Sequence, residues 1–308
     1  MNNLILILGI IGGIILPIQT SINTNLKDNT KGTPFMASLG SFIVGTLSLL
    51  LALLVTKTPI LVPASVITTQ PWWIWLGGLL GIIGLTANVV IFPYLGAVQT
   101  VIMPILGQIF MSMLIDALGL FGTPIHSLTL TRFLGIGLLI VGILMVILQK
   151  NIKQDQSGIS KLPWQIIGII AGMFQATQTP INGHLGLVLH SAVHAAFISF
   201  LIGVIGLFII VAFTDHGYAK FKNAFGKGHP WWIWLGGFLG ALYVLFNAIL
   251  SPVIGAGATV VLVILGNLFG SVLVDKYGLL GAPKKPITVA KYIGLVLMVM
   301  GVTLIKLF

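Results

Sequence analysis

Amide side chains recur at one-turn spacing in two long apolar segments of this chain. Gln19 and Asn23 lie four residues apart, as do Gln178 and Asn182, and Gln175 extends the second set. Residues at positions i and i+4 share one face of a helix. Because an amide that faces lipid is costly, this face should contact protein or a water-filled passage. These side chains therefore either bind a polar solute along a pathway or join helices by hydrogen bonds.

Four more amides occupy matched positions in other apolar segments: Asn88 with Asn247, and Gln108 with Asn267. Gln108 and Asn267 lie about 20 Å along their segments at about 1.5 Å per residue, close to the middle of a membrane. We expect all four to contact a substrate, with helix packing as the alternative.

Two acidic residues lie at the ends of apolar segments. Asp116 and Asp275 are each followed, 16 residues later, by a basic residue, Arg132 and Lys291. Each pair is expected to form a structural clasp. A role in gating or proton coupling is the alternative, since ionisable groups at such positions often serve transport.

Three histidines, His184, His190 and His194, lie close together, and the last two have a spacing that can hold a metal ion. No carboxylate joins them, and the chain has no cysteine. We expect neither a metal site nor a cofactor.

The composition places most of the surface in a bilayer. The chain is 57% hydrophobic and 6% charged, and its five acidic residues are all Asp. Soluble domains carry about 25% charged residues. The net charge of +10 could suggest nucleic acid, but the basic residues lie in short connectors without a basic, aromatic-rich stripe. Nucleic-acid binding is therefore not expected, and without a nucleophile–base pair neither is catalysis.

A membrane-spanning helix needs about 20 mostly apolar residues. Ten segments qualify, which predicts an all-α membrane protein: 4–25, 35–55, 72–92, 95–117, 132–149, 164–185, 192–213, 231–251, 254–274 and 290–307.

The chain also repeats itself at an offset of 159 residues. The sequence PWWIWLGG starts at Pro71 and again at Pro230, and 26 of 52 positions are identical between 71–122 and 230–281. We therefore divide the chain into a five-helix repeat at 1–149, a cytoplasmic connector at 150–163 and a second five-helix repeat at 164–308. Because five is odd, the second repeat must be inverted, an arrangement that many secondary transporters use.

The basic residues predict the orientation. Twelve lie in or beside the connectors between helices 1–2, 5–6, 7–8 and 9–10, and three (Lys57, Arg132 and Lys306) lie on the other side. By the positive-inside tendency, both termini then lie outside the cytoplasm. Gln19 would lie toward the cytoplasm, Gln178 and Asn182 toward the exterior, and the two stripes would line opposite vestibules with Gln108 and Asn267 between them.

Three features together carry a family resemblance: PWWIWLGG, the Gln-x-x-x-Asn stripe of each first helix, and the Asp-x-x-Gly motif that closes each fourth helix. With them the chain resembles the YdcZ family of inner-membrane exporters, in the drug/metabolite transporter superfamily, in a fused ten-helix form. The resemblance implies a transporter of the bacterial plasma membrane and leaves its substrate open. Some small relatives in the superfamily couple to protons through an intramembrane Glu, a residue type that this chain lacks.

Transport by alternating access between the two inverted repeats is the function that we expect, with export of a small polar metabolite or drug-like molecule. Neutral amides favour an uncharged or zwitterionic solute. A passive channel and a membrane scaffold are the alternatives. The expected partners are the lipid bilayer and a small-molecule substrate, and a coupling ion is left open.

Overall fold

Helices account for every regular element that the computed structural model describes, over residues 3–123, 125, 129–147, 160–225, 229–281, 284 and 288–307. The α-helices are α1 (Asn3–Thr30), α2 (Pro34–Val55), α3 (Ala64–Thr69), α4 (Gly77–Leu118), α5 (Leu130–Ile147), α6 (Leu162–Val188), α7 (Ala192–Thr214), α8 (Leu235–Ile254), α9 (Ala256–Tyr277) and α10 (Val289–Leu307). Short 3-10 turns are η1 (Trp72–Trp75), η2 (Leu120–Gly122), η4 (Ala219–Ala224), η5 (Trp231–Trp234) and η6 (Leu279–Gly281).

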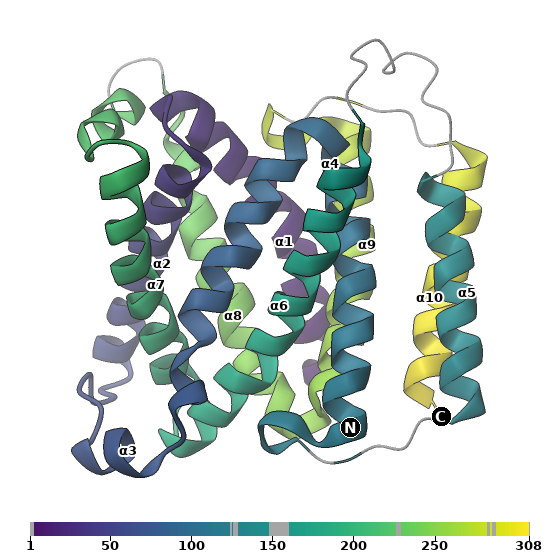
Figure 1. Ribbon diagram of the computed structural model, residues 1–308, viewed down its shortest axis with the longest axis horizontal. Coiled ribbons are helices and arrows are strands. Elements are labelled where there is room, and N and C mark those ends of the chain that lie inside the picture. Colours follow the sequence, from purple (N-terminus) through teal and green to yellow (C-terminus); the bar gives the residue numbers. More distant parts are fainter. Residues whose placement is uncertain are drawn as a thin grey trace.

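Each of the ten predicted segments coincides with a helix, and the third and fourth are the two arms of α4. This element turns back on itself at Gly96, whose φ is 74° (Figure 1). Gly255, at the matching position 159 residues later, has a φ of 83° and separates α8 from α9. Glycine takes this left-handed conformation without steric cost, so both repeats place it at the same hairpin.

The helices suit a bilayer in length and composition. Among the described residues, seven spans are long and apolar enough to cross a membrane: Ile5–Thr30, Pro34–Val55, Gly77–Gly96, Gln99–Leu118, Ala192–Thr214, Trp231–Ile254 and Ala256–Tyr277. The apolar parts of α5 and α10 are shorter, and α6 is diluted by its amides and hydroxyls. The fold is therefore an all-α membrane fold, built as two inverted five-helix repeats.

The two helices that carry the amide stripes remain continuous through a proline. α1 runs through Pro17 and α6 runs through Pro180. Proline removes one backbone hydrogen bond, which a membrane helix can tolerate when its neighbours satisfy the freed carbonyl group. The amide stripes are thus presented on unbroken helices.

The two repeats interlock around their first helices. α1 packs on α8 and α9 of the other repeat, and α6 packs on α4 in the same way. α2 pairs with α7, where the rings of Phe42 and Phe200 lie 4.8 Å apart between centroids. Each ring fills the space beside a glycine of the opposite helix, Gly203 and Gly45 respectively. The same Phe-x-x-Gly spacing occurs in both helices at an offset of 158 residues, so α2 and α7 meet through equivalent residues.

The helix directions place the connectors at two opposite edges (Figure 1). The turns after α1, α7 and α9, which carry most of the described lysines, lie at one edge, and we call it the lysine-rich edge. The start of α1 and the end of α10 lie at the other edge. Residues 148–159, most of the predicted connector, lie outside the described residues.

Candidate functional site: a pocket shared by both repeats

One small pocket, of about 40 Å³, is formed by residues of both repeats. Its polar lining is made of amides: Gln19 from α1, Asn88 from α4, and Gln175 and Gln178 from α6. The remaining lining residues are apolar, aromatic or glycine: Leu16, Phe42, Gly81, Gly84, Leu85, Phe200, Gly240, Tyr243 and Val244. Four of the nine predicted pathway residues therefore meet at one place.

The pocket differs from the predicted pair of vestibules. Gln19 and Gln178 lie in the wall of the same pocket, whereas their depths along the predicted helices placed them toward opposite sides. The reason is helix length. α1 continues to Thr30 and α6 to Val188, so both glutamines lie nearer the middle of their helices than the shorter predicted segments implied.

The asparagines of the two stripes sit against glycines of the opposite repeat. A methyl group on Gly236 would overlap the Asn23 amide, and a methyl group on Gly77 would overlap the Asn182 amide. Since Gly77 and Gly236 are 159 residues apart, as are Asn23 and Asn182, the two contacts are the same contact with the repeats exchanged. The absence of a Cβ atom lets each amide approach the neighbouring backbone.

The glutamines follow the same rule one helical turn away. Gln19 fills the space beside Gly240, and Gln178 fills the space beside Gly81. The Nε2 atom of Gln178 also donates to the carbonyl oxygen of Gly77 at 3.0 Å. The glycine pairs Gly77/Gly81 and Gly236/Gly240 therefore form the surfaces against which the amide stripes pack.

Gln175 links a second amide to the pocket. The Nε2 atom of Gln108 donates to its Oε1 atom at 2.9 Å, and Gln175 Nε2 lies 3.5 Å from the carbonyl oxygen of Gly84. In the first repeat, Leu16 occupies the position that matches Gln175. The pocket is therefore matched between the repeats at Gly81 and Gly240 and at Gln19 and Gln178, but it is asymmetric in this hydrogen bond.

The other predicted amides are buried, and they differ in whether they reach the central pocket. Asn88 reaches the pocket, and among the described residues its Oδ1 atom has no hydrogen-bond partner. Asn247 donates to the carbonyl oxygen of Tyr243 at 2.7 Å, one turn back in α8. Asn267 is 1% exposed on α9, beside the glycine-lined contact with α1. Asn247 and Asn267 do not line the central pocket.

The bundle is closed differently at its two edges. At the lysine-rich edge, Ser21 Oγ donates to the carbonyl oxygens of Leu279 and Leu280, and Asn25 Nδ2 donates to that of Leu280 at 2.6 Å. At the opposite edge, Trp73 contacts the rings of Phe121 and His184 at centroid distances of 5.4 and 5.0 Å. Hydrogen bonds thus hold one edge, and aromatic contacts hold the other.

Both closures involve a residue in an unfavourable backbone conformation. Phe121 has a φ of 58° and its match Leu280 has a φ of 54°. Such values are uncommon for residues other than glycine and persist only where surrounding contacts enforce them. The turns η2 and η6 are therefore candidate gates.

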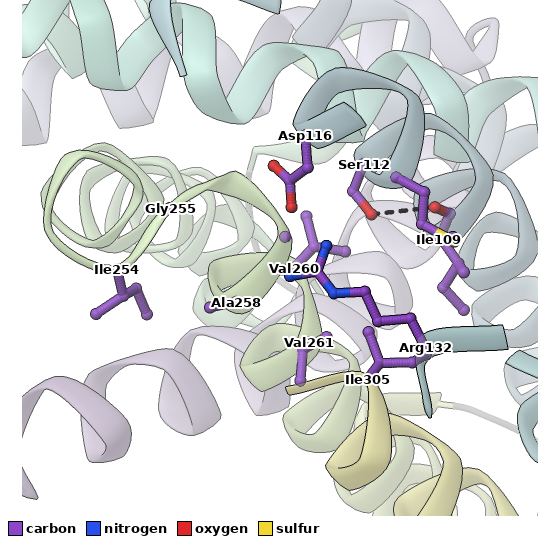
Figure 2. A pocket seen from close by; sticks show the side chains of 12 residues that line it. Ile109, Ser112, Asp116, Arg132, Ile254, Gly255, Ala258, Val260, Val261 and Ile305 are labelled. Carbon is purple, nitrogen blue, oxygen red and sulfur yellow. Dashed lines mark hydrogen bonds between the residues drawn. The ribbon is translucent and has the colours of Figure 1, made fainter. Parts of the chain in front are cut away.

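The predicted clasp residues of the first repeat share a second, larger cavity. Asp116 and Arg132 line a pocket of about 170 Å³ with Ser112 and the start of α9, and both side chains point into it (Figure 2). The Asp116 carboxylate occupies the space beside Gly257, in the first turn of α9, where amide dipoles favour a negative charge. In the second repeat Asp275 is 1% exposed, while the Lys291 side chain lies outside the described residues.

The histidines take separate positions. His184 packs against Trp73, and the Nε2 atom of His194 lies 3.0 Å from the carbonyl oxygen of Ile60. His194 also lies in the first turn of α7, where its backbone N–H donates to Oγ of the N-cap residue Ser191.

Sequence reasoning missed several lining residues. Phe42 and Phe200 are aromatic residues in apolar helices, and Tyr243 stands where the first repeat has Gly84. One pattern in the sequence could have indicated the two phenylalanines. Phe42 lies three residues before Gly45, and Phe200 lies three residues before Gly203. The first repeat has no tyrosine at the position that matches Tyr243, so the internal repeat did not mark Tyr243 as a candidate site residue.

Comparison with known proteins identifies the family. The family described as "Putative inner membrane exporter, YdcZ" matches the chain twice, at residues 4–145 and 163–304. The chain belongs to this family. The YdcZ match begins 159 residues later in its second copy, which is the offset of the internal repeat. The protein is thus a multi-pass membrane protein of an exporter family.

A solved structure supports the fold. A chain described only as "Crystal structure of protein" is 16% identical, with a TM-score of 0.62 over 98% of this chain and 94% of its own length. At that identity the likeness concerns the fold alone. No curated protein matches the sequence.

Proposed function

We propose that this protein is a secondary transporter that exports a small polar solute by alternating access, with the shared amide pocket as its substrate site. The observation that carries this proposal is the exchange of contacts between repeats: each amide stripe sits on glycines of the other half. Because the same contacts recur with the repeats exchanged, similar contacts lie between the pocket and each edge. A rocking motion of one repeat against the other can therefore open the pocket to either side.

The lining favours a neutral or zwitterionic solute. The four amides offer hydrogen bonds, and Phe42, Phe200 and Tyr243 offer apolar ring surfaces. None of the lining residues is acidic or basic. A net charge in this pocket would be desolvated without a counter-charge, which is costly.

We also propose that the protein lies in the bacterial plasma membrane with both termini outside. The lysine-rich edge would then face the cytoplasm, as the positive-inside tendency favours. In that orientation the hydrogen-bonded closure by η6 is cytoplasmic, and the aromatic closure by η2 is external.

The test begins with a thermal-shift screen of the purified protein, using matched pairs of solutes that differ only in charge. An uncharged or zwitterionic member should raise the melting temperature, and Gln178→Leu should abolish that rise. Flux of the solute that binds is then measured in proteoliposomes. Saturable flux supports a transporter, whereas flux that rises linearly with concentration favours a channel. Binding without flux would contradict the proposal.

A further inference from the structure

The central pocket is not symmetric at two of the positions that the internal repeat relates. Leu16 lines it where the second repeat has Gln175, and Gly84 lines it where the second repeat has Tyr243. Gln175 packs on Gly84, since a Cβ atom on Gly84 would lie 2.7 Å from the Gln175 Cγ atom. With the repeats exchanged, the same pair of positions holds Leu16 and Tyr243. The two pairs therefore give opposite sides of the pocket a different chemistry.

One side carries amides. Asn88 follows Gly84 by four residues on α4, so the two residues share a helix face. Gln175 fills the space that the missing side chain of Gly84 leaves. Both Asn88 and Gln175 line the pocket, and we call them the amide side.

The other side is apolar. Leu16, Tyr243 and Val244 line it and belong to one buried apolar cluster, and we call these three residues the apolar side. Asn247, which matches Asn88, adds no amide here. It does not line the pocket, and its Nδ2 atom donates to the backbone carbonyl oxygen of Tyr243 at 2.7 Å.

The amide side has hydrogen-bonding capacity that the protein leaves unused. Asn88 is 3% exposed, and its Oδ1 atom has no partner among the described residues. Rotation of the terminal amide exchanges its oxygen and nitrogen, so Asn88 can turn an acceptor toward a ligand. Gln175 Oε1 already accepts from Gln108, but Gln175 Nε2 lies 3.5 Å from the Gly84 carbonyl oxygen, beyond the usual limit of about 3.2 Å. The side thus offers one acceptor and one donor.

We propose that this pocket binds a small uncharged molecule with a carboxamide group at one end and a short hydrocarbon group at the other, in a single orientation. The carboxamide N–H donates to Asn88 and its carbonyl oxygen accepts from Gln175, while the hydrocarbon packs on Leu16 and the Tyr243 ring. Buried polar groups need hydrogen-bond partners, and such a ligand supplies both. The inference rests on the proposed function, because it names the class of solute for the same pocket.

The size of the pocket favours a compact molecule. Its volume is about 40 Å³. A water-sized group needs about 10–15 Å³, so the pocket in this closed form has room for about three such groups. Propionamide, an ethyl group on a carboxamide, is therefore a suitable probe. Its isomer N,N-dimethylformamide has the same atoms but no N–H group.

Melting temperatures of the purified protein in a millimolar series of each isomer test the hydrogen bonds. Propionamide should raise the melting temperature, and N,N-dimethylformamide should not. Asn88→Leu should weaken propionamide binding by about tenfold, the effect expected from losing one buried hydrogen bond. Asn267→Leu is the control. Asn267 is also buried with an Oδ1 atom that has no partner among the described residues, but it does not line the pocket, so this variant should bind propionamide normally.

Chain length tests the orientation. Leu16→Ala enlarges the apolar side and should shift the preference from propionamide to butyramide, which is one methylene longer. Tyr243→Leu enlarges the same side and should shift the preference in the same direction, which provides a second measurement. Gln175→Leu keeps the size of the side chain on the amide side but removes its donor. It should weaken both ligands and leave their ratio unchanged.

Three results would overturn the inference: equal shifts with the two isomers, an equal loss of binding in Asn88→Leu and Asn267→Leu, or the same change of chain-length preference in Gln175→Leu as in Leu16→Ala. The proposed function is judged separately. Saturable flux of another solute, with no binding of either amide, would overturn this inference alone. Propionamide that binds without being transported would contradict the proposed function and leave the binding site in place.

Discussion

The amide of Asn182 in α6 lies so close to Gly77 in α4 that Gly77 has no room for a methyl group. With the repeats exchanged, the amide of Asn23 in α1 stands in the same relation to Gly236 in α8. These two contacts hold the two halves of the protein together on either side of the central pocket. They predict that a glycine variant is rescued only by removing the asparagine that its own methyl group meets.

Gly77→Ala should destabilise the protein by about 1–3 kcal/mol, because an added methyl group in a packed interface forces side chains from their positions. Asn182→Ala should rescue Gly77→Ala, since it removes the amide that the methyl group meets. Asn182→Ala should not rescue Gly236→Ala, whose methyl group meets Asn23. Melting temperatures of the purified variants measure these effects.

A control comes from Gly137, where an added methyl group meets nothing within 4 Å. Gly137→Ala should be neutral or slightly stabilising, since alanine is the better helix former. Rescue of both glycine variants by Asn182→Ala, or of neither, would contradict the crosswise pairing.

The orientation can be measured because the chain has no native cysteine. We expect an impermeant maleimide added outside the cells to label Lys57→Cys and to leave Lys222→Cys unlabelled until the membrane is opened. The physical reason is the excess of lysines at the edge that carries Lys222. The reverse labelling pattern would invert the proposed orientation.

The charged residues at the helix ends are proposed to act as pairs, Asp116 with Arg132 and Asp275 with Lys291. Neutralising one member should lower expression and melting temperature more than neutralising both, since a partly buried charge without its counter-charge is the expensive state. Asp116→Asn, Arg132→Gln and the double variant are compared, as are the matching variants of the second repeat. A double variant no milder than either single one would exclude the pairing.

Asp215, just after α7, provides a pH test. Burial alone would raise the pKa of its carboxyl group, but hydrogen bonds from Thr33 and Lys220 outweigh burial and leave the pKa below its ordinary value of 3.8. The backbone N–H of Thr33 and the Lys220 ammonium each donate at 2.9 Å. Because the folded pKa is lowered, this contact stabilises the protein above the unfolded pKa and is lost as pH falls toward the folded one.

Asp215→Asn should therefore melt below the unchanged protein at pH 7, and the difference should shrink as the pH falls below about 4. Melting curves at several pH values check this. Asp28→Asn, an exposed carboxylate beside Lys27, is the control and should behave as the unchanged protein at every pH. A difference for Asp215→Asn that stays constant down to pH 3 would refute the assignment.

Much of the fold could be predicted from the sequence because duplication leaves a direct record. The pairing of Asn23 with Asn182 and of Gly77 with Gly236 at one offset gave the repeat, and the odd helix number gave its inversion. The internal repeat does not show whether a helix packs against its own half or against the other half. Nothing in the spacing of Asn23 indicates a contact with Gly236, 213 residues away, because helical periodicity reports a face and not its partner.

The same gap explains the candidate site. Depth along a single helix assigned Gln19 and Gln178 to different vestibules, whereas the interlocked helices bring both into one pocket. The glycines beside these amides lie at the four-residue spacing that is typical of close helix packing, and this spacing does not show that amides pack against them. The contact between these glycines and the amide side chains of the other repeat becomes visible only in the three-dimensional packing.

The central claim is that one pocket is exposed alternately to the two edges, and single-cysteine labelling with locked gates tests it most directly. Gln19→Cys is combined with an oxidative cross-link at one edge, between cysteines at Asn25 and Leu280 or between cysteines at Trp73 and Phe121. An impermeant maleimide is then applied to either side of oriented vesicles. With the Asn25–Leu280 edge locked, the pocket cysteine should react only from the side of Trp73, and with the Trp73–Phe121 edge locked, only from the lysine-rich side. Reaction from both sides in one locked state, or from neither side in both, would contradict alternating access through this pocket.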